Sequence, residues 1–149
     1  MGYVRLVLDT DVVVAAVRSN AGSSRRLLRA ALQRRFILLA SVPLIVEYEA
    51  VLTREEHLKA SGLTAAHVQV LLDGVALVAE PVQLVFLWRP LLRDPNDDMV
   101  LETAVNGDAD ALVTFNQRDF ADVAERFGVR VCLPREALQV LEKTKNAKE

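Results

Sequence analysis

Three things are scarce in this sequence: cysteine, an excess of either charge, and long hydrophobic runs. Cys132 is the single cysteine among 149 residues, so the chain can form neither an internal disulfide nor a zinc cluster of several thiolates. Eighteen basic residues against 20 acidic ones give a formal charge of −2, so any binding to nucleic acid would depend on local patches. No apolar stretch approaches the roughly 20 residues that span a bilayer. Without such a span or a signal-peptide layout, we expect a cytoplasmic protein with no membrane contact.

What is present is enough apolar sequence for one compact domain. The chain is 52% hydrophobic and 26% charged, which is typical of a globular domain with a real core. We expect a single domain over residues 1–142 and a polar, disordered tail over 143–149.

Short apolar runs alternate with segments of helical spacing. The pattern predicts strands at 4–8, 36–40, 111–115 and 129–133, with 82–88 either a strand or a surface loop. Helices are predicted at 11–17, 24–34 with a serine cap, 41–52, 97 or 98 to 105, 122–127 and from 134, with two more in a helical insertion at about 54–80. Strands separated by helices pair in parallel, so the predicted fold is an α/β protein, a three-layer α/β/α sandwich around a central parallel sheet.

Acidic residues recur where the predicted strands end, which is where parallel sheets bind their ligands. They are Asp9 and Asp11 after the first strand, Glu47 on the helix after the second, Asp97 and Asp98 at a helix start, and Asp119 beyond Asn116 after the third. Carboxylates that converge raise one another's pKa, and a bound cation removes that cost. An all-oxygen set with no histidine or cysteine pattern favours Mg²⁺ or Mn²⁺.

Each acid also has an ordinary structural explanation. Asp97 and Asp98 are typical helix caps, and Glu47 fits a solvated helix face. Asp9 is the hardest to explain in this way, because an acid directly after a buried strand needs a compensating charge or several hydrogen bonds.

Basic residues concentrate between positions 18 and 35, and they include Arg18, Arg25 and Arg26. They fit either a solvated helix face or a strip that contacts phosphates beside the acids. The two histidines, His57 and His67, fall in the helical insertion and are expected to be merely solvated.

Four segments together resemble the PIN-domain family, in particular the VapC-type toxins of prokaryotic toxin–antitoxin modules. They are residues 8–12 (LDTDV), 41–48 (SVPLIVEY), 93–98 (RDPNDD, with Ala104 following) and 110–120 (DALVTFNQRDF), and the resemblance runs from Val4 to about Val140.

The resemblance implies that Asp9, Glu47 and Asp98 bind metal. A fourth acid often follows the strand that here contains Thr114; this chain has Asn116 there, with Asp119 three residues on. Relatives often carry Asn where this chain has Asp11. We therefore expect catalytic roles for Asp9, Glu47, Asp98 and Asp119, and supporting roles for Asp11, Asp97, Thr114 and Asn116.

The function implied is that of an endoribonuclease that hydrolyses single-stranded RNA with Mg²⁺ or Mn²⁺, as the toxin of a toxin–antitoxin module. A small antitoxin would be its partner, a homodimer its assembly, and the apolar segment 84–92 around Trp88 a candidate contact surface. Two alternatives stay open. The D-x-D motif at Asp9 also matches haloacid-dehalogenase phosphatases, in which the first Asp is the nucleophile, and the chain could be a non-catalytic PIN-like module that binds RNA or protein.

Overall fold

The structure is a computed structural model, and it describes residues 2–19, 22–85 and 95–148. The strands are β1 (Arg5–Leu8), β2 (Ile37–Ala40), β3 (Glu80–Pro81), β4 (Ala111–Val113) and β5 (Arg130–Cys132). The helices are α1 (Thr10–Arg18), α2 (Ser23–Leu32), α3 (Val42–Leu52), α4 (Glu55–Ser61), α5 (Ala65–Val78), α6 (Pro95–Asn106), α7 (Gln117–Arg126) and α8 (Pro134–Lys148).

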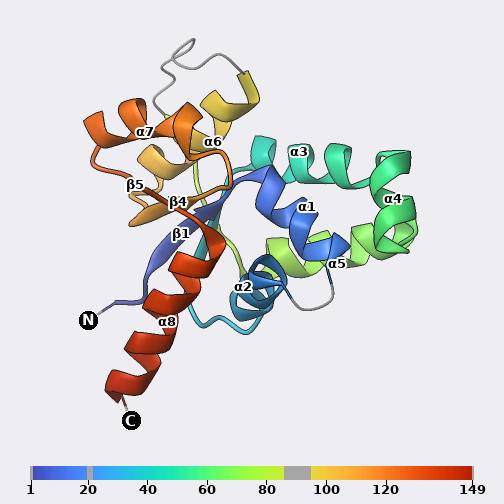
Figure 1. Ribbon diagram of the computed structural model, residues 1–149. Helices are drawn as coiled ribbons and strands as arrows, with labels where there is room; N and C mark the ends of the chain where they lie inside the picture. The colour runs from blue at the N-terminus through green and yellow to red at the C-terminus, as the bar shows by residue number, and fades with distance from the viewer. Residues whose placement is uncertain (1, 20–21, 86–94, 149) are drawn as a thin grey trace.

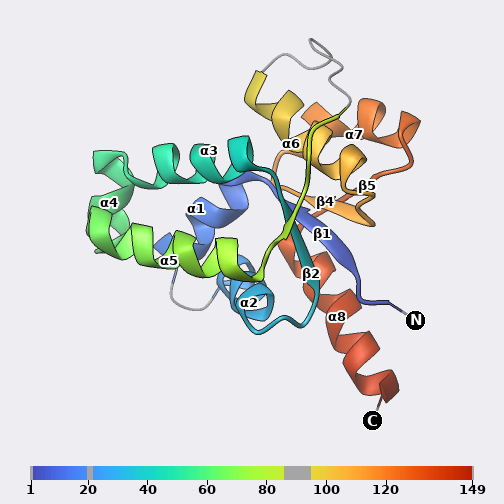
Figure 2. The same ribbon diagram turned by 180° about the vertical axis from the view of Figure 1, so that it is seen from behind.

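The five strands form one parallel sheet in the order β3-β2-β1-β4-β5. β1 lies at its centre, and Leu6, Val7 and Leu8 are buried because helices cover both faces. Helices α6 and α7 lie on one face and α2 and α8 on the other, with α3, α4 and α5 beside α1 at one end (Figures 1 and 2). The predicted α/β class with a central parallel sheet is confirmed.

The parallel arrangement has one consequence for function. Chain direction is the same in all five strands, so the residues that follow β1, β2 and β4 meet at one edge of the sheet. We call this the carboxyl edge.

Helix capping explains which helix starts were predicted correctly. The Ser41 hydroxyl accepts from Leu44 N at the start of α3, and the Thr64 hydroxyl accepts from His67 N at the start of α5, as the sequence indicates. The predicted helical insertion is thus present as α4 and α5. However, α5 buries Val68, Leu72 and Val75 in the main core, so it is an integral part of the domain.

Several predicted boundaries are wrong. Helix α2 starts at Ser23 after Gly22, which makes no side-chain cap, and Ser24 is buried inside the helix. Helix α6 starts at Pro95, and α7 starts at Gln117 instead of Asp122. Helix α8 continues to Lys148, through most of the segment predicted as a disordered tail. Segment 82–88 is predicted as either a strand or a surface loop. Its described residues, 82–85, form neither a strand nor a helix, and the short strand β3 comes directly before them. Residues 86–88 lie outside the described residues.

Among the described residues, no single helix is long and apolar enough to cross a membrane. The bent pair α4 and α5 meets that test only by combined length and composition.

Candidate metal centre

Asp9 is fixed where β1 ends. Register pairs Leu8 of β1 with Val113 of β4, so the next residues, Asp9 and Thr114, also lie side by side. Asp9 Oδ2 accepts a hydrogen bond of 2.7 Å from the Thr114 hydroxyl, and Oδ1 accepts one of 2.7 Å from the backbone N of Thr10, which caps α1. With Asp9 only 7% exposed, these bonds supply the compensation that a buried acid requires.

Asp11 lies in the first turn of α1, next to Asp9. Its Oδ2 accepts from Phe115 N at 3.2 Å and lies 3.4 Å from the Thr114 hydroxyl, whose single proton favours the shorter bond to Asp9. Its Oδ1 is buried and has no hydrogen-bond partner among the described residues. Burial, and then the charge of Asp9, raise the pKa of Asp11 to about 7. The two acids therefore form a close pair in which Asp11 is held unfavourably.

Helix α3 is tied to the same edge through Tyr48. The Tyr48 hydroxyl is buried and donates to the carbonyl oxygen of Leu8, the last residue of β1. Burial and the charge of Asp9 raise the pKa of this hydroxyl far above its ordinary value. Glu47 precedes Tyr48 on this helix and is half-buried.

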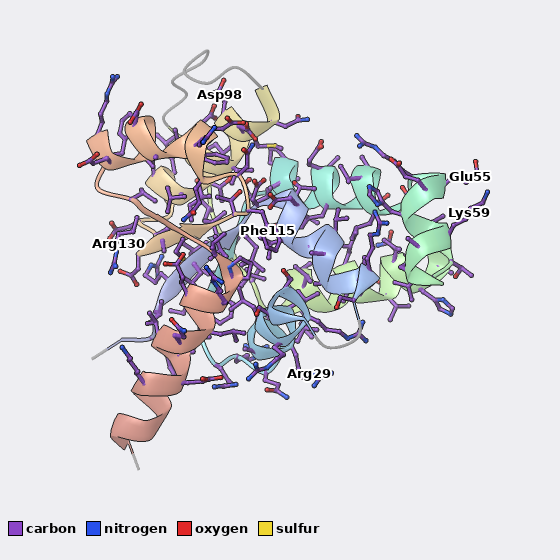
Figure 3. The ribbon with its side chains drawn as sticks, in the orientation of Figure 1. Arg29, Glu55, Lys59, Asp98, Phe115 and Arg130 are labelled. Carbon is purple, nitrogen blue, oxygen red and sulfur yellow. The ribbon has the colours of Figure 1, made fainter. Side chains whose placement is uncertain are left out.

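Helix α6 reaches the carboxyl edge from the other side. The Thr103 hydroxyl lies 2.8 Å from that of Ser41, the residue that follows β2, which fixes α6 against the start of α3. Asp97 and Asp98 lie in the first turn of α6, after Pro95, and so are not the cap residues that the sequence predicts. Asp98 is 3% exposed, which shows that it is not on a solvated surface. Figure 3 shows Asp98 on this helix.

Glu102 is a buried acid that the sequence analysis missed. It is 2% exposed and follows Asp98 by four residues on α6. Residues four apart share one helix face, so this spacing was a signal for a second inward carboxylate.

Asn116 and Asp119 form a pair at the start of α7. Asn116 occupies the N-cap position without a side-chain cap bond; instead its Nδ2 donates to Asp119 Oδ2, while its backbone N donates to the Thr114 hydroxyl at 2.9 Å. Both side chains are exposed. Asn116 thus connects Asp119 to the residue that holds Asp9.

The three arginines predicted as an RNA-contacting strip are occupied elsewhere. Arg26 forms an ion pair of 2.9 Å with Glu142, and Arg25 donates to the carbonyl oxygens of Ala16 and Ser19 at 3.4 and 3.5 Å. Arg18 ends α1, so about two and a half helical turns separate it from Asp9. The structure therefore does not bring these arginines to the acids.

The two histidines are not merely solvated, contrary to expectation. Nδ1 of His57 lies 3.4 Å from the guanidinium of Arg18, and Nδ1 of His67 accepts from Thr64 N in the α5 capping box.

The residues present fit a hard divalent cation. The buried, partnerless oxygen of Asp11 beside Asp9 is a position that a cation would satisfy, and the acids gathered at this edge offer oxygen ligands. As they stand, the described side chains include no group of three or more His, Cys, Asp or Glu close enough to hold a metal ion. The Asp9–Asp11 pair is therefore the part of a centre that is already assembled.

Comparison with known proteins agrees with this architecture. The PIN domain matches residues 5–118 of this chain. Among solved structures, VapBC2 from Rickettsia felis, bound to a DNA fragment from its promoter, is similar with a TM-score of 0.55 and 16% identity over 85% of this chain and 96% of that one. The search of curated proteins gave no match. Because the PIN match covers more than half of the chain, including β1 to β4 and the acids Asp9, Asp11, Glu47, Asp97 and Asp98, the chain belongs to the PIN-domain family.

Proposed function

We propose that this protein is an endoribonuclease that hydrolyses phosphodiester bonds in single-stranded RNA with the help of Mg²⁺ or Mn²⁺. The observation that carries the proposal is the pair formed by buried Asp9 and half-buried Asp11, whose buried Oδ1 has no partner among the described residues, at the carboxyl edge of a PIN-domain sheet. Without a bound metal, two carboxylates so close together repel each other, and a divalent cation between them turns this repulsion into attraction to the ion.

Asp9, Glu47 and Asp98 would hold the ion. When bound, the ion lowers the pKa of water to give hydroxide and stabilises the negative charge that builds on the phosphate. The Thr114 hydroxyl and Thr10 N keep the Asp9 carboxylate in one orientation. Asp98 is already buried on α6, whereas the half-buried Glu47 would turn inward to complete the set.

Asp119 and Asp97 would orient the attacking water or a second ion. Asn116 Nδ2 donates to Asp119 Oδ2, so the other carboxylate oxygen of Asp119, Oδ1, is the atom that would bind a water molecule. Asp97 is half-buried beside Asp98 at the start of α6. In the sequence, Asn116 stands where relatives often carry a fourth acid and Asp119 follows three residues later; the hydrogen bond between their side chains supports a joint role.

A toxin role, a small antitoxin partner, a homodimer and a cytoplasmic location belong to the same proposal. Their support is the resemblance to VapC-type toxins and the shared fold with VapBC2. Most of the segment 84–92, our candidate contact surface, lies outside the described residues.

A non-catalytic PIN module is the second candidate, and one observation favours it: the described residues hold no assembled group of three metal-ligating side chains. Metal titration by calorimetry separates the two, since a non-catalytic module of this kind would show no binding of Mg²⁺ or Mn²⁺. The phosphatase alternative, with Asp9 as nucleophile, loses its basis because the PIN match extends beyond D-x-D over the next two motifs and the fourth as far as Arg118.

The decisive experiment is Asp9→Asn, assayed on single-stranded RNA with Mn²⁺ or Mg²⁺ and again with EDTA. The amide oxygen of Asn can still cap α1 at Thr10 N, and its NH2 group can donate to the Thr114 hydroxyl, whose own proton can turn to Asp11 Oδ2. The fold should therefore survive while cleavage falls by about a hundredfold or more. Glu49→Gln, an exposed acid on the same helix as Glu47, is the control and should cleave normally. Cleavage by Asp9→Asn at the wild-type rate would remove the site assignment.

A further inference from the structure

Phe115 is an exposed aromatic residue directly beside the acid pair. It is 51% exposed, whereas Thr114 before it is fully buried. The described residues include eight large, exposed hydrophobic side chains, and only Tyr3 and Phe115 among them are aromatic. Tyr3 precedes β1 and therefore lies at the opposite edge of the sheet, so Phe115 is the exposed ring at the carboxyl edge.

The backbone around Phe115 is held by the candidate metal centre. Phe115 N donates to Asp11 Oδ2 at 3.2 Å, and on its two sides Thr114 donates to Asp9 while Asn116 N donates to the Thr114 hydroxyl. The ring is thus attached to residues that themselves bond the acids, and Figure 3 shows it near α1. Such anchoring lowers the backbone entropy that the segment loses when a ligand docks.

Arg118 adds a cation to the same surface. It is exposed in the first turn of α7, three residues after Phe115, and it makes no ion pair with any of the described residues. Phe115 therefore lies beside the acid pair just before α7, and Arg118 lies in the first turn of that helix. A nucleotide offers the matching groups, namely a base with an apolar face and phosphates on either side.

We propose that Phe115 is the stacking platform for a nucleobase next to the scissile phosphate of single-stranded RNA, with Arg118 contacting a neighbouring phosphate. The proposal rests on the proposed ribonuclease function. Stacking requires a base face that is not already covered, so the platform selects unpaired RNA over a duplex, whose bases stack on one another. Phe115 is a positioning residue, since it binds the substrate and takes no part in proton transfer.

The test compares Phe115→Ala and Phe115→Trp with the wild-type protein in steady-state cleavage of a short single-stranded RNA. Loss of one base–aromatic stack should raise KM by about 5- to 150-fold, with kcat little changed, while Trp should restore a KM near the wild-type value. Leu77→Ala, which removes another exposed apolar side chain, this one from α5, is the matched control and should leave KM unchanged. Mn²⁺ binding by calorimetry should be the same in all four proteins.

A second measurement replaces single bases of the RNA by abasic sites. At one position the abasic substitution should raise the wild-type KM as much as Phe115→Ala does, and the two changes together should add nothing further. An unchanged KM for Phe115→Ala, or strictly additive effects at every position, would overturn the platform. It would also be overturned if Phe115→Ala altered only the sedimentation behaviour, which would make the ring a protein contact. Absence of metal-dependent cleavage by the wild-type protein would instead refute the underlying function.

Discussion

At the scale of single residues, an acid and an amide have changed places relative to the PIN-domain pattern, at positions 11 and 116. Asp11 stands where relatives often carry Asn, and Asn116 stands where they often carry an acid. The structure brings the Asp11 carboxylate to Phe115 N, on the segment that leads to Asn116. A carboxylate is therefore still present at the end of β4, supplied by α1 instead of by the segment after the strand.

The pH dependence of stability should reveal Asp11. Burial and the charge of Asp9 raise the pKa of Asp11 from 3.8 to about 7. The folded protein therefore retains a proton that the unfolded chain loses, and the free energy of unfolding should fall as the pH rises from about 4 to 7. Below about pH 4 and above about pH 7, Asp11 does not contribute to the change of unfolding free energy with pH.

Urea unfolding at pH 5 and pH 8 in EDTA measures this effect. Asp11→Asn removes the charge, so at pH 8 we expect it to exceed the wild-type stability by more than about 1 kcal/mol, the equivalent of one pKa unit. Glu49→Gln, which alters an exposed acid, should follow the wild-type profile. Parallel profiles for wild type and Asp11→Asn would show that Asp11 is ionised at neutral pH in the folded protein.

At the scale of elements, the turn after α6 packs tightly against the sheet. A Cβ placed on Gly107 would lie 2.8 Å from Val82 Cγ2 and 2.9 Å from the backbone oxygen of Thr103. Gly107→Ala should therefore destabilise the protein by about 1–3 kcal/mol, as overpacking does. If Asp98 binds the cation as proposed, a shift of α6 caused by this substitution should weaken metal affinity as well.

Gly74 provides the matched comparison. It lies inside α5, where an added Cβ would meet only Leu32 Cδ2 at an ordinary 3.7 Å. Gly74→Ala should stabilise the protein by about 0.5–1 kcal/mol, because alanine loses less backbone entropy in a helix. Thermal unfolding of both variants decides the point: equal shifts in the same direction would contradict the packing argument.

Element boundaries also show how far local sequence determines structure. Ser41 and Thr64 cap α3 and α5 as predicted, because a cap needs only neighbouring backbone N–H groups. The α6 start was placed too late, because Asp97 and Asp98 have the composition of caps while Pro95 is equally suited to a first helical position. Local sequence does not distinguish a helix that starts at Pro95 from one that starts at Asp97 or Asp98. The burial of Asp98 in the interior, inside the first turn, distinguishes them.

At the scale of the whole molecule, metal binding and folding stability should be linked. If a cation compensates the Asp9–Asp11 pair, it binds the folded state alone and stabilises it by about 2.7 kcal/mol at 100 times its Kd. For a chain of this size that corresponds to a rise in Tm of roughly 5–10 °C. Differential scanning fluorimetry with Mn²⁺, Mg²⁺ and EDTA measures the shift, which Asp9→Asn should abolish and Phe115→Ala should retain. An equal Tm with and without Mn²⁺ at millimolar concentration would contradict a metal centre.

The sequence by itself determined the fold class and the parallel sheet, and it indicated Asp9 and Asp11 as acids that follow the first strand. These follow from apolar periodicity and from the position of each acid after a strand, which are local properties. Only the tertiary structure decided how the acids differ, because burial and hydrogen bonding depend on contacts between residues distant in the chain. The β1–β4 register makes Thr114 hold Asp9, and the same contact leaves one oxygen of Asp11 buried without a partner among the described residues. Asp98 is buried by α6 packing and not exposed as a cap, whereas Phe115, apolar and next to a strand, is exposed at the rim.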